Sequence, residues 1–266
     1  MLKTRVITAL CLAAGLLAAL FLLPPAASST LFAAVIALGA WEWAGLLRAS
    51  GRARRRYALL TLAPCLSLYL FGMPAAVTGG LWFLALGFWL LLVPLWFSRR
   101  WALKADLNGF LLGWLLLVPS WAAMVTLQRR SPLLLLAAMS LVWVADIAAY
   151  FAGRAWGRRK LAPTISPGKT WEGAAGALVA VIIYGLLLGI ATGRLNKPRQ
   201  FAVAAAALAL ATAVSIVGDL FESLAKRQAG VKDSSALLPG HGGVLDRIDS
   251  LTSTLPLVAL AAVCLA

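Results

Sequence analysis

The residues with the clearest potential for chemistry are concentrated in one polar run, residues 223–249, near the end of an otherwise apolar chain. This run contains the only histidine, His241, together with four basic residues and three aspartates. The basic residues are Lys226, Arg227, Lys232 and Arg247, and the aspartates are Asp233, Asp246 and Asp249. Seven of the nine acidic residues of the chain lie between positions 146 and 249. Because charge is costly beside a bilayer, this clustering indicates a functional site.

The spacing of the acidic residues predicts two helical stripes that face each other. If a helix continues past Asp219, then its polar residues recur every three or four positions and share one face. They are Asp219, Glu222, Ser223 and Lys226, and the set Asp246, Asp249, Ser250 and Ser253 repeats the pattern after Gly242 and Gly243. Facing aspartates form a site of hard oxygen ligands. Such a site suits Mg²⁺, which uses one or two carboxylates and completes its coordination with phosphates and water.

The connection between the two stripes has features that favour a phosphate ligand. Gly242 and Gly243 let backbone N–H groups approach an anion closely, and the helix that follows adds a favourable dipole. Lys226, Arg227 and Arg247 supply the positive charge that a triphosphate requires.

A second polar segment, residues 143–173, contains Asp146 near the end of an apolar stretch. Residues 166–170 (Ser-Pro-Gly-Lys-Thr) predict a turn, after which Thr170 caps a helix with Glu172 in its first turn. An acid inside an apolar span indicates a functional residue. The alternative for Asp146 is a structural role, as a carboxylate buried between helices and paired with a nearby Arg or Lys. For Glu172 the alternative is simple helix capping.

The composition predicts an all-α, polytopic integral membrane protein. Hydrophobic residues make up 62% of the 266 residues, charged residues only 12%, and the mean hydropathy is +0.90. A soluble domain has roughly 25% charged residues. We predict about nine transmembrane helices, at residues 6–23, 29–47, 58–77, 80–97, 110–127, 132–151, 173–192, 201–221 and 251–266. These form a single domain over 1–266, whose catalytic loops and helix ends lie at about 143–250. A cleaved signal peptide is the alternative for the first span.

The distribution of basic residues predicts the orientation. With the N-terminus in the cytoplasm, 19 of the 24 lysines and arginines fall on cytoplasmic segments, as the positive-inside rule requires. The polar segments 152–172 and 222–250 then face the cytoplasm of a bacterial-type inner membrane. The net charge of +15 suits an anionic lipid surface. It does not indicate a nucleic-acid partner, because the basic residues are spread over many loops.

The run resembles the signature of the phosphatidate cytidylyltransferases, also called CDP-diacylglycerol synthases. The matching positions are Ser223, Lys226-Arg227, Lys232-Asp233 and the block Pro239-Gly240-His241-Gly242-Gly243-Val244-Leu245-Asp246-Arg247-Ile248-Asp249. Residues 160–163 and 166–173 also resemble this family, and the region of Trp41-Glu42-Trp43 does so faintly. The chain departs from the family at Ala225, where a bulkier apolar residue is usual, and at Ile147-Ala148, where a small polar residue and glycine are usual.

The resemblance implies transfer of CMP from CTP to phosphatidic acid, which gives CDP-diacylglycerol and pyrophosphate. It also implies Mg²⁺, a second cation beside it, and a homodimer. Asp219 and Asp246 are the first choice as Mg²⁺ ligands, with Asp249 next. Lys226, Arg227 and Lys232 are expected to hold the triphosphate and the departing pyrophosphate.

The remaining candidates are expected to contact substrate, and several keep a structural alternative. These residues are Ser223, Asp146, Lys169, Glu172, Gly242, Gly243 and Arg247. Ser223 binds either a phosphate oxygen or its own helix backbone, and Arg247 binds either phosphate or an acid. We assign His241 to the catalytic set as a phosphate or ribose donor, with a loop-bracing hydrogen bond as its alternative. Asp233 is expected to cap or brace the loop.

Two other classes of function are compatible with parts of the pattern. A polyprenol or dolichol kinase also uses CTP, but transfers the γ-phosphoryl group and releases CDP. A secondary transporter also carries acids within its spans, but usually shows internal repeats and mid-bilayer sites. The two halves of this chain are not alike, and its polar residues lie near span ends.

Overall fold

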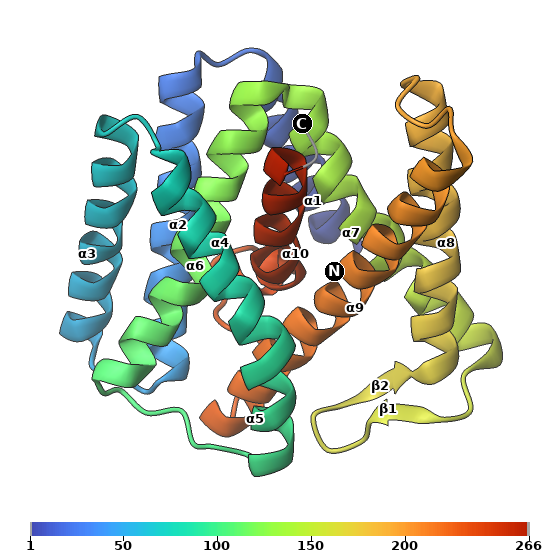
Figure 1. Ribbon diagram of the computed structural model, residues 1–266. Coiled ribbons are helices and arrows are strands. Elements are labelled where there is room, and N and C mark those ends of the chain that lie inside the picture. The colour runs from blue at the N-terminus through green and yellow to red at the C-terminus, as the bar shows by residue number, and fades with distance from the viewer. Residues whose placement is uncertain (1, 265–266) are drawn as a thin grey trace.

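The computed structural model describes residues 2–264, and it is a bundle of long helices with one small β-hairpin (Figure 1). Its elements are α1 (Leu2–Phe21), α2 (Pro25–Leu46), α3 (Gly51–Leu70), α4 (Ala75–Gly87), the π-helical turn η1 (Phe88–Leu92), α5 (Val93–Arg99), α6 (Leu107–Arg130), α7 (Pro132–Trp156), β1 (Lys160–Ala162), β2 (Ser166–Thr170), α8 (Trp171–Ala191), α9 (Pro198–Ala229) and α10 (Leu245–Cys264). Within this range, eight helical segments are long and apolar enough to cross a membrane. The all-α, polytopic membrane class is thereby confirmed.

Besides these eight segments, the described part of the chain has one more long helix, α3. Its bounds correct the predicted span 58–77. It begins at Gly51 and includes four arginines in its first two turns, which lower its apolar character. It ends at Leu70, because Gly72 and Met73 adopt positive φ and Pro74 follows. The next span, Ala75–Arg99, consists of α4, the π-helical turn η1 and α5, which follow one another without a gap.

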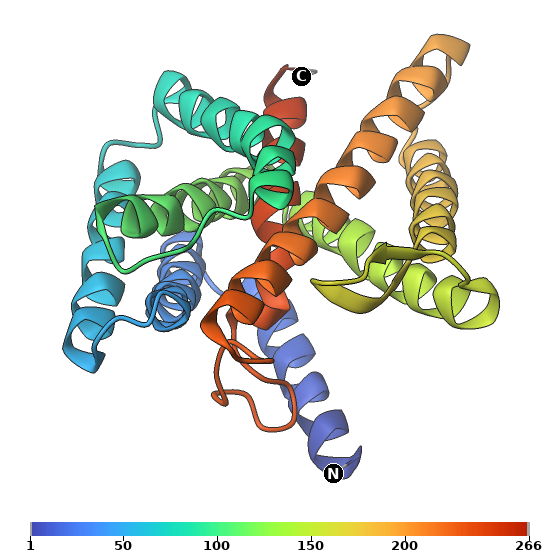
Figure 2. The same ribbon diagram turned by 90° about the horizontal axis from the view of Figure 1, so that it is seen from below.

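The most buried of the eight spans is α6, which lies in the middle of the bundle between α2 and α10. Figure 1 shows α10 in the centre, α3 at one edge and α8 at the other, with α9 running obliquely across the bundle. Seen from below, α9 and α10 cross near the centre, where the connection between them protrudes (Figure 2). Helices α9 and α10 contact each other and also α2 and α7.

An aromatic cluster holds α9 against the centre of the bundle. Phe221 stacks on Trp43 of α2 with ring centroids 6.3 Å apart, and it meets Phe88, Trp89 and Trp96 edge-on at 5.5–5.8 Å. Such pairs contribute about 0.5–1.5 kcal/mol each beyond the burial of their area. Phe221 lies between Asp219 and Glu222 in the sequence, so this packing fixes the register of the polar face of α9.

The prediction of a turn at residues 166–170 is wrong, because these residues form strand β2 of an antiparallel hairpin. Strand β1 pairs with β2, with Lys160 opposite Thr170 and Ala162 opposite Ser166. The predicted cap is confirmed, because the Thr170 hydroxyl accepts from the backbone N–H of Gly173, 3.1 Å away, at the start of α8. The hairpin brings β2 against α9.

Candidate active site

The polar face of α9 forms as its spacing predicted, because the helix continues as far as Ala229. Asp219, Glu222, Ser223 and Lys226 therefore lie on successive turns of one face. Helix α10 begins at Leu245, two residues after Gly243, and includes Asp246 and Asp249. A helix that starts after Gly242 and Gly243 was predicted and is confirmed, and it extends beyond the start of the apolar span predicted at 251–266 to include the polar residues 246–250.

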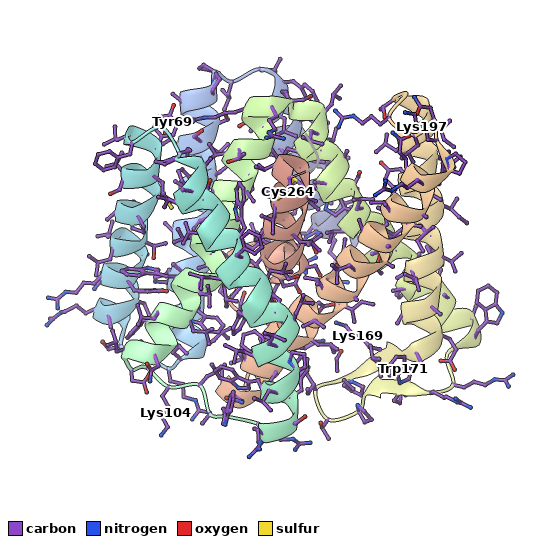
Figure 3. The ribbon with its side chains drawn as sticks, in the orientation of Figure 1. Tyr69, Lys104, Lys169, Trp171, Lys197 and Cys264 are labelled. Carbon is purple, nitrogen blue, oxygen red and sulfur yellow. The ribbon has the colours of Figure 1, made fainter. Side chains whose placement is uncertain are left out.

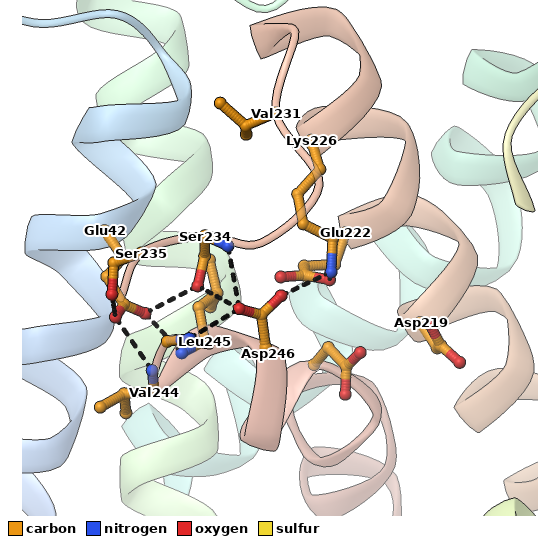
Figure 4. Close-up of polar contacts among 12 residues, drawn as sticks. Glu42, Asp219, Glu222, Lys226, Val231, Ser234, Ser235, Val244, Leu245 and Asp246 are labelled. Atoms are coloured by element: carbon orange, nitrogen blue, oxygen red, sulfur yellow. Dashed lines mark hydrogen bonds and ion pairs between the residues drawn. The ribbon is translucent and has the colours of Figure 1, made fainter. Parts of the chain in front are cut away.

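Lys226 joins the two helices through a pair of carboxylates. Its ammonium group forms ion pairs with Glu222, one turn earlier on α9, and with Asp246 of α10, where Nζ lies 2.6 Å from Oδ1 (Figure 4). The three side chains are only 12%, 5% and 4% exposed. In this arrangement the charge of Lys226 is neutralised by protein groups, so the lysine positions the two helices and has little charge left for a triphosphate.

Asp246 is also fully engaged in hydrogen bonds. Its Oδ2 atom accepts from the backbone N–H of Ser234 at 2.9 Å, the Ser234 hydroxyl at 2.9 Å and the backbone N–H of Gly243 at 2.8 Å. With Oδ1 on Lys226, both oxygens are committed to holding the connection between α9 and α10. This geometry favours a positioning role for Asp246 over that of a metal ligand.

The start of α10 is capped by Glu42 of α2, which is fully buried. Its carboxylate accepts from the backbone N–H groups of Val244 at 2.9 Å and Leu245 at 2.6 Å, and from the hydroxyls of Ser234 at 3.1 Å and Ser235 at 2.6 Å. A carboxylate at a helix N-terminus satisfies free N–H groups and interacts favourably with the helix dipole. Glu42 is thus a structural part of the site.

Our sequence reasoning did not include Glu42 among the site residues. The available signal was its place as the only acid in the apolar stretch 29–47. Such an acid requires a partner.

Two glycines of the connection are required by close packing. A Cβ atom on Gly243 would overlap the Ser234 hydroxyl and the Glu42 carboxylate, and one on Gly242 would lie 2.7 Å from Asp246 Oδ2. Gly242 also has a φ of +80°, which favours glycine. Both residues therefore act by allowing the carboxylates to approach the backbone.

A second group of charged residues lies farther from the connection, around a cavity of about 590 Å³. Asp146 of α7, Lys169 of β2 and Asp219 of α9 line this cavity, together with residues of α8. Lys169 forms an ion pair with Asp219, and Figure 3 shows Lys169 between the hairpin and α9. Two side chains from the second polar segment, residues 143–173, therefore lie beside the acidic face of α9.

Asp249 connects the two groups of charges. It lies close enough to Asp219, Asp146 and Lys226 to interact with them electrostatically. Its Oδ1 accepts from the backbone N–H of Ser250 at 2.7 Å. The approach of the helices at this point depends on Gly218, where a Cβ atom would collide with Ser253.

No three acidic, histidine or cysteine side chains among residues 2–264 converge closely enough to hold a metal ion by themselves.

Four of the predicted site residues lie elsewhere or have other contacts. Arg227 follows Lys226 on α9 but points to another side, where its Nε donates to the Ile165 carbonyl at 3.3 Å. Glu172 is exposed and accepts from the backbone N–H groups of Arg158 and Arg159 at 3.1–3.3 Å, so it braces the start of the hairpin. Lys232 is exposed on the connection. His241 has a buried Nδ1 with no hydrogen-bond partner within residues 2–264.

Comparison with known proteins decides the family. A profile of the cytidylyltransferase family matches residues 3–265, which is nearly the whole chain. The chain belongs to the cytidylyltransferase family. It is 44% identical to a phosphatidate cytidylyltransferase of Pseudomonas aeruginosa, over 97% of this chain and 96% of that protein. It is 37% identical to that of Haemophilus influenzae, over 96% of both chains. A Brucella suis phosphatidate cytidylyltransferase is 51% identical over 46% of this chain and 43% of its own length.

Membership of the cytidylyltransferase family confirms the resemblance carried by residues 223–249. In this member of the family, the polar residues of α9, α10 and their connection separate into two groups. Lys226, Asp246, Gly242 and Gly243 build the α9–α10 junction. Asp219 lines the cavity and pairs with its lysine, and Asp249 lies near Asp219 on α10.

Proposed function

We propose that the chain transfers CMP from CTP to phosphatidic acid, giving CDP-diacylglycerol and pyrophosphate. The observation that carries this proposal is the cavity beside Asp146, Lys169 and Asp219, in a chain aligned end to end with phosphatidate cytidylyltransferases. A cavity of this size accommodates a nucleotide or a lipid headgroup, because ligand pockets typically measure about 300–1,000 Å³.

The reaction needs little acid–base chemistry from the protein. An oxygen of the phosphatidate phosphate attacks the α-phosphorus of CTP, and the bond from that phosphorus to the oxygen bridging to the β-phosphate breaks. That oxygen keeps the electron pair and leaves with pyrophosphate. The attacking oxygen is already anionic near neutral pH, so catalysis consists chiefly of positioning and charge neutralisation. The absence of a nucleophile–base pair among the lining residues agrees with this chemistry.

Asp219 at the cavity and Asp249 on the neighbouring helix α10 fit a single Mg²⁺ ion that is shared with a substrate. Asp219 and Asp249 are carboxylates that are not consumed by the junction, and Mg²⁺ needs only one or two such ligands beside phosphate and water. Asp219 already holds a cation, the Lys169 ammonium group. When bound, Mg²⁺ supplies charge neutralisation for the triphosphate. We propose Asp219 and Asp249 as its ligands, with Asp246 fixing the helix that carries Asp249.

The other residues of the site act by orientation. Lys169 holds the Asp219 carboxylate at the cavity wall. Lys226 and Asp246 tie α9 to α10, and Glu42 sets the start of α10. His241 offers a free Nδ1 atom close to this junction, which suits a hydrogen bond to phosphate or ribose.

Further parts of the proposal concern the setting of the enzyme. The charge distribution supports a cytoplasmic N-terminus and a cytoplasmic site, with 19 of the 24 basic residues on cytoplasmic segments. The inner membrane supplies phosphatidic acid and the cytoplasm supplies CTP. The resemblance supports a homodimer and a second cation beside Mg²⁺, and nucleic acid has no part in this function.

A product assay tests the proposed reaction. Purified protein receives Mg²⁺, phosphatidic acid and CTP carrying a radioactive α-phosphate, and the lipid extract is then counted. The proposal requires label in the lipid and equimolar release of pyrophosphate. Labelled CDP with an unlabelled lipid would instead assign the chain to the lipid kinases, and a parallel reaction with γ-labelled CTP separates the two outcomes.

A further inference from the structure

A separate basic pocket of about 490 Å³ lies at the end of the bundle where α2, α5 and α9 terminate. The tip of the hairpin forms its remaining wall, and Figure 1 shows α5, this tip and the lower end of α9 at the same end of the bundle. Arg48, Arg100 and Arg227 line the pocket, each from a different helix end. None of its lining residues belongs to the cavity that contains Asp146, Lys169 and Asp219.

The pocket carries positive charge that no acid of the described chain neutralises. No aspartate or glutamate lines it, and the ion pairs found within residues 2–264 all involve lysines. A guanidinium group has five N–H donors. In the described structure the three arginines use only four donor hydrogens: one of Arg48, one of Arg100 and two of Arg227.

Hydrogen bonds hold these guanidinium groups in place. Arg48 donates to the Gln228 carbonyl at 3.2 Å, and Arg100 donates to the Thr164 hydroxyl at 3.3 Å. Arg227 donates to the Ile165 carbonyl at 3.3 Å. Helix ends attract arginine for a simpler reason, since its charge offsets the helix dipole. That reason accounts for each arginine separately, but it does not account for three of them around one pocket.

Gln228 fixes the wall of the pocket that lies beside α5. Its side-chain amide donates to the Trp101 carbonyl at 2.9 Å, and its Oε1 accepts from the backbone N–H of Leu103 at 2.8 Å. The segment 101–103 is therefore clasped to the last turn of α9. These hydrogen bonds fix the wall of the pocket that Ala102 and Leu103 form.

We propose that Arg48, Arg100 and Arg227 form a binding site for a phosphate-bearing anion, distinct from the site of CMP transfer. Planar guanidinium forks match the oxygens of phosphate, often with two hydrogen bonds each. This pocket shares no lining residue with the cavity at Asp219, and Arg227 lies eight residues beyond Asp219, or about 12 Å along the axis of α9. A soluble pyrophosphate group and the headgroup of an anionic phospholipid share this chemistry.

Binding of pyrophosphate tests the soluble source. The full chain is placed in nanodiscs of neutral lipid without CTP or phosphatidic acid, and titrated with pyrophosphate in a calorimeter. Arg48→Gln and Arg100→Gln should each weaken binding about tenfold, the scale of one lost charge-assisted contact. Arg100 has a φ of +51°, and glutamine leaves this backbone strain unchanged. Arg55→Gln, an exposed arginine outside the pocket, is the matched control and should bind like the unmodified chain.

Retention of an anionic lipid tests the other source. The same proteins are purified from membranes containing phosphatidylglycerol, and bound lipid is counted by native mass spectrometry. A lipid that stays on the unmodified chain and on Arg55→Gln, but is lost from Arg48→Gln and Arg100→Gln, supports the proposal with a lipid ligand. Arg100→Lys keeps the charge but not the planar guanidinium group, so it should retain an amount of lipid between those of the unmodified chain and Arg100→Gln. This intermediate result shows that the loss in Arg100→Gln is not caused by misfolding.

The proposal is overturned if the two pocket variants match the control in both measurements. Neither measurement involves turnover, so this result is independent of whether the chain transfers CMP.

Discussion

The carboxylate of Glu42 accepts a 2.6 Å hydrogen bond from the backbone N–H of Leu245, a residue 203 positions later in the chain. Leu245 is the first residue of α10, and Glu42 lies near the end of α2. The contact thus sets where the acidic helix of the site begins. Because the carboxylate is fully buried, its four hydrogen bonds are needed to offset the loss of hydration.

Glu42→Ala should destabilise the protein and reduce turnover together. Removing the carboxylate leaves the N–H groups of Val244 and Leu245 without their acceptor, at a cost of about 1–3 kcal/mol. Thermal unfolding in detergent measures the first effect and CDP-diacylglycerol formation the second. Glu42→Gln keeps one acceptor oxygen, so its melting temperature and its turnover should lie between those of the unmodified protein and Glu42→Ala. An unchanged melting temperature for Glu42→Ala would contradict the capping role.

Lys226→Met should cost more stability than any single change of an exposed lysine. It leaves the buried carboxylates of Glu222 and Asp246 without their cation, and breaking a buried pair from one side typically costs about 3–5 kcal/mol. The double variant Lys226→Met/Glu222→Gln removes one of the stranded charges and should regain part of that stability. Lys232→Met, on the exposed connection, is the control for stability. If the double variant is no more stable than Lys226→Met, the ion pair is not what holds the junction.

Asp219→Asn and Asp246→Asn should differ in their response to Mg²⁺. We expect Asp219→Asn to raise the Mg²⁺ concentration for half-maximal activity at least about tenfold, the scale on which loss of groups supporting a metal acts. Asp246→Asn should chiefly lower the melting temperature, because both Asp246 oxygens hold the junction. Activity titrations with Mg²⁺ and thermal unfolding, made on both variants, separate these effects. A higher Mg²⁺ requirement in Asp246→Asn alone would reverse the assignment.

A cysteine at Ala236 should react with a membrane-impermeant reagent only when the cytoplasmic face is accessible. The positive-inside pattern places the α9–α10 connection in the cytoplasm, and Ala236 is exposed on it. Ser234 is less suitable, because its hydroxyl binds both Glu42 and Asp246. The three native cysteines, Cys11, Cys65 and Cys264, are first replaced. Labelling of intact cells would place the site on the outer face.

Much of the site could be predicted from local patterns in the sequence. The spacing of Asp219, Glu222 and Lys226 places them on one helical face because the period of an α-helix is fixed. The Thr170 cap also follows from neighbouring residues. The apolar spans could be predicted because each helix in a bilayer must satisfy its own backbone hydrogen bonds and present apolar side chains to lipid. The fixed spacing of residues 223–249 indicated the family.

The partners of these residues were decided by the tertiary structure. Lys226 and Arg227 are adjacent and equally basic, but one turns into the α9–α10 junction and the other toward the tip of the hairpin. Asp219 and Asp246 occupy equivalent positions in the two polar stripes. Of these two residues, only Asp246 accepts hydrogen bonds from backbone N–H groups. The sequence by itself determined which residues share a helix face. Which face meets which, and therefore which charge is neutralised, depends on packing between helices far apart in the chain, and no local pattern contains that information.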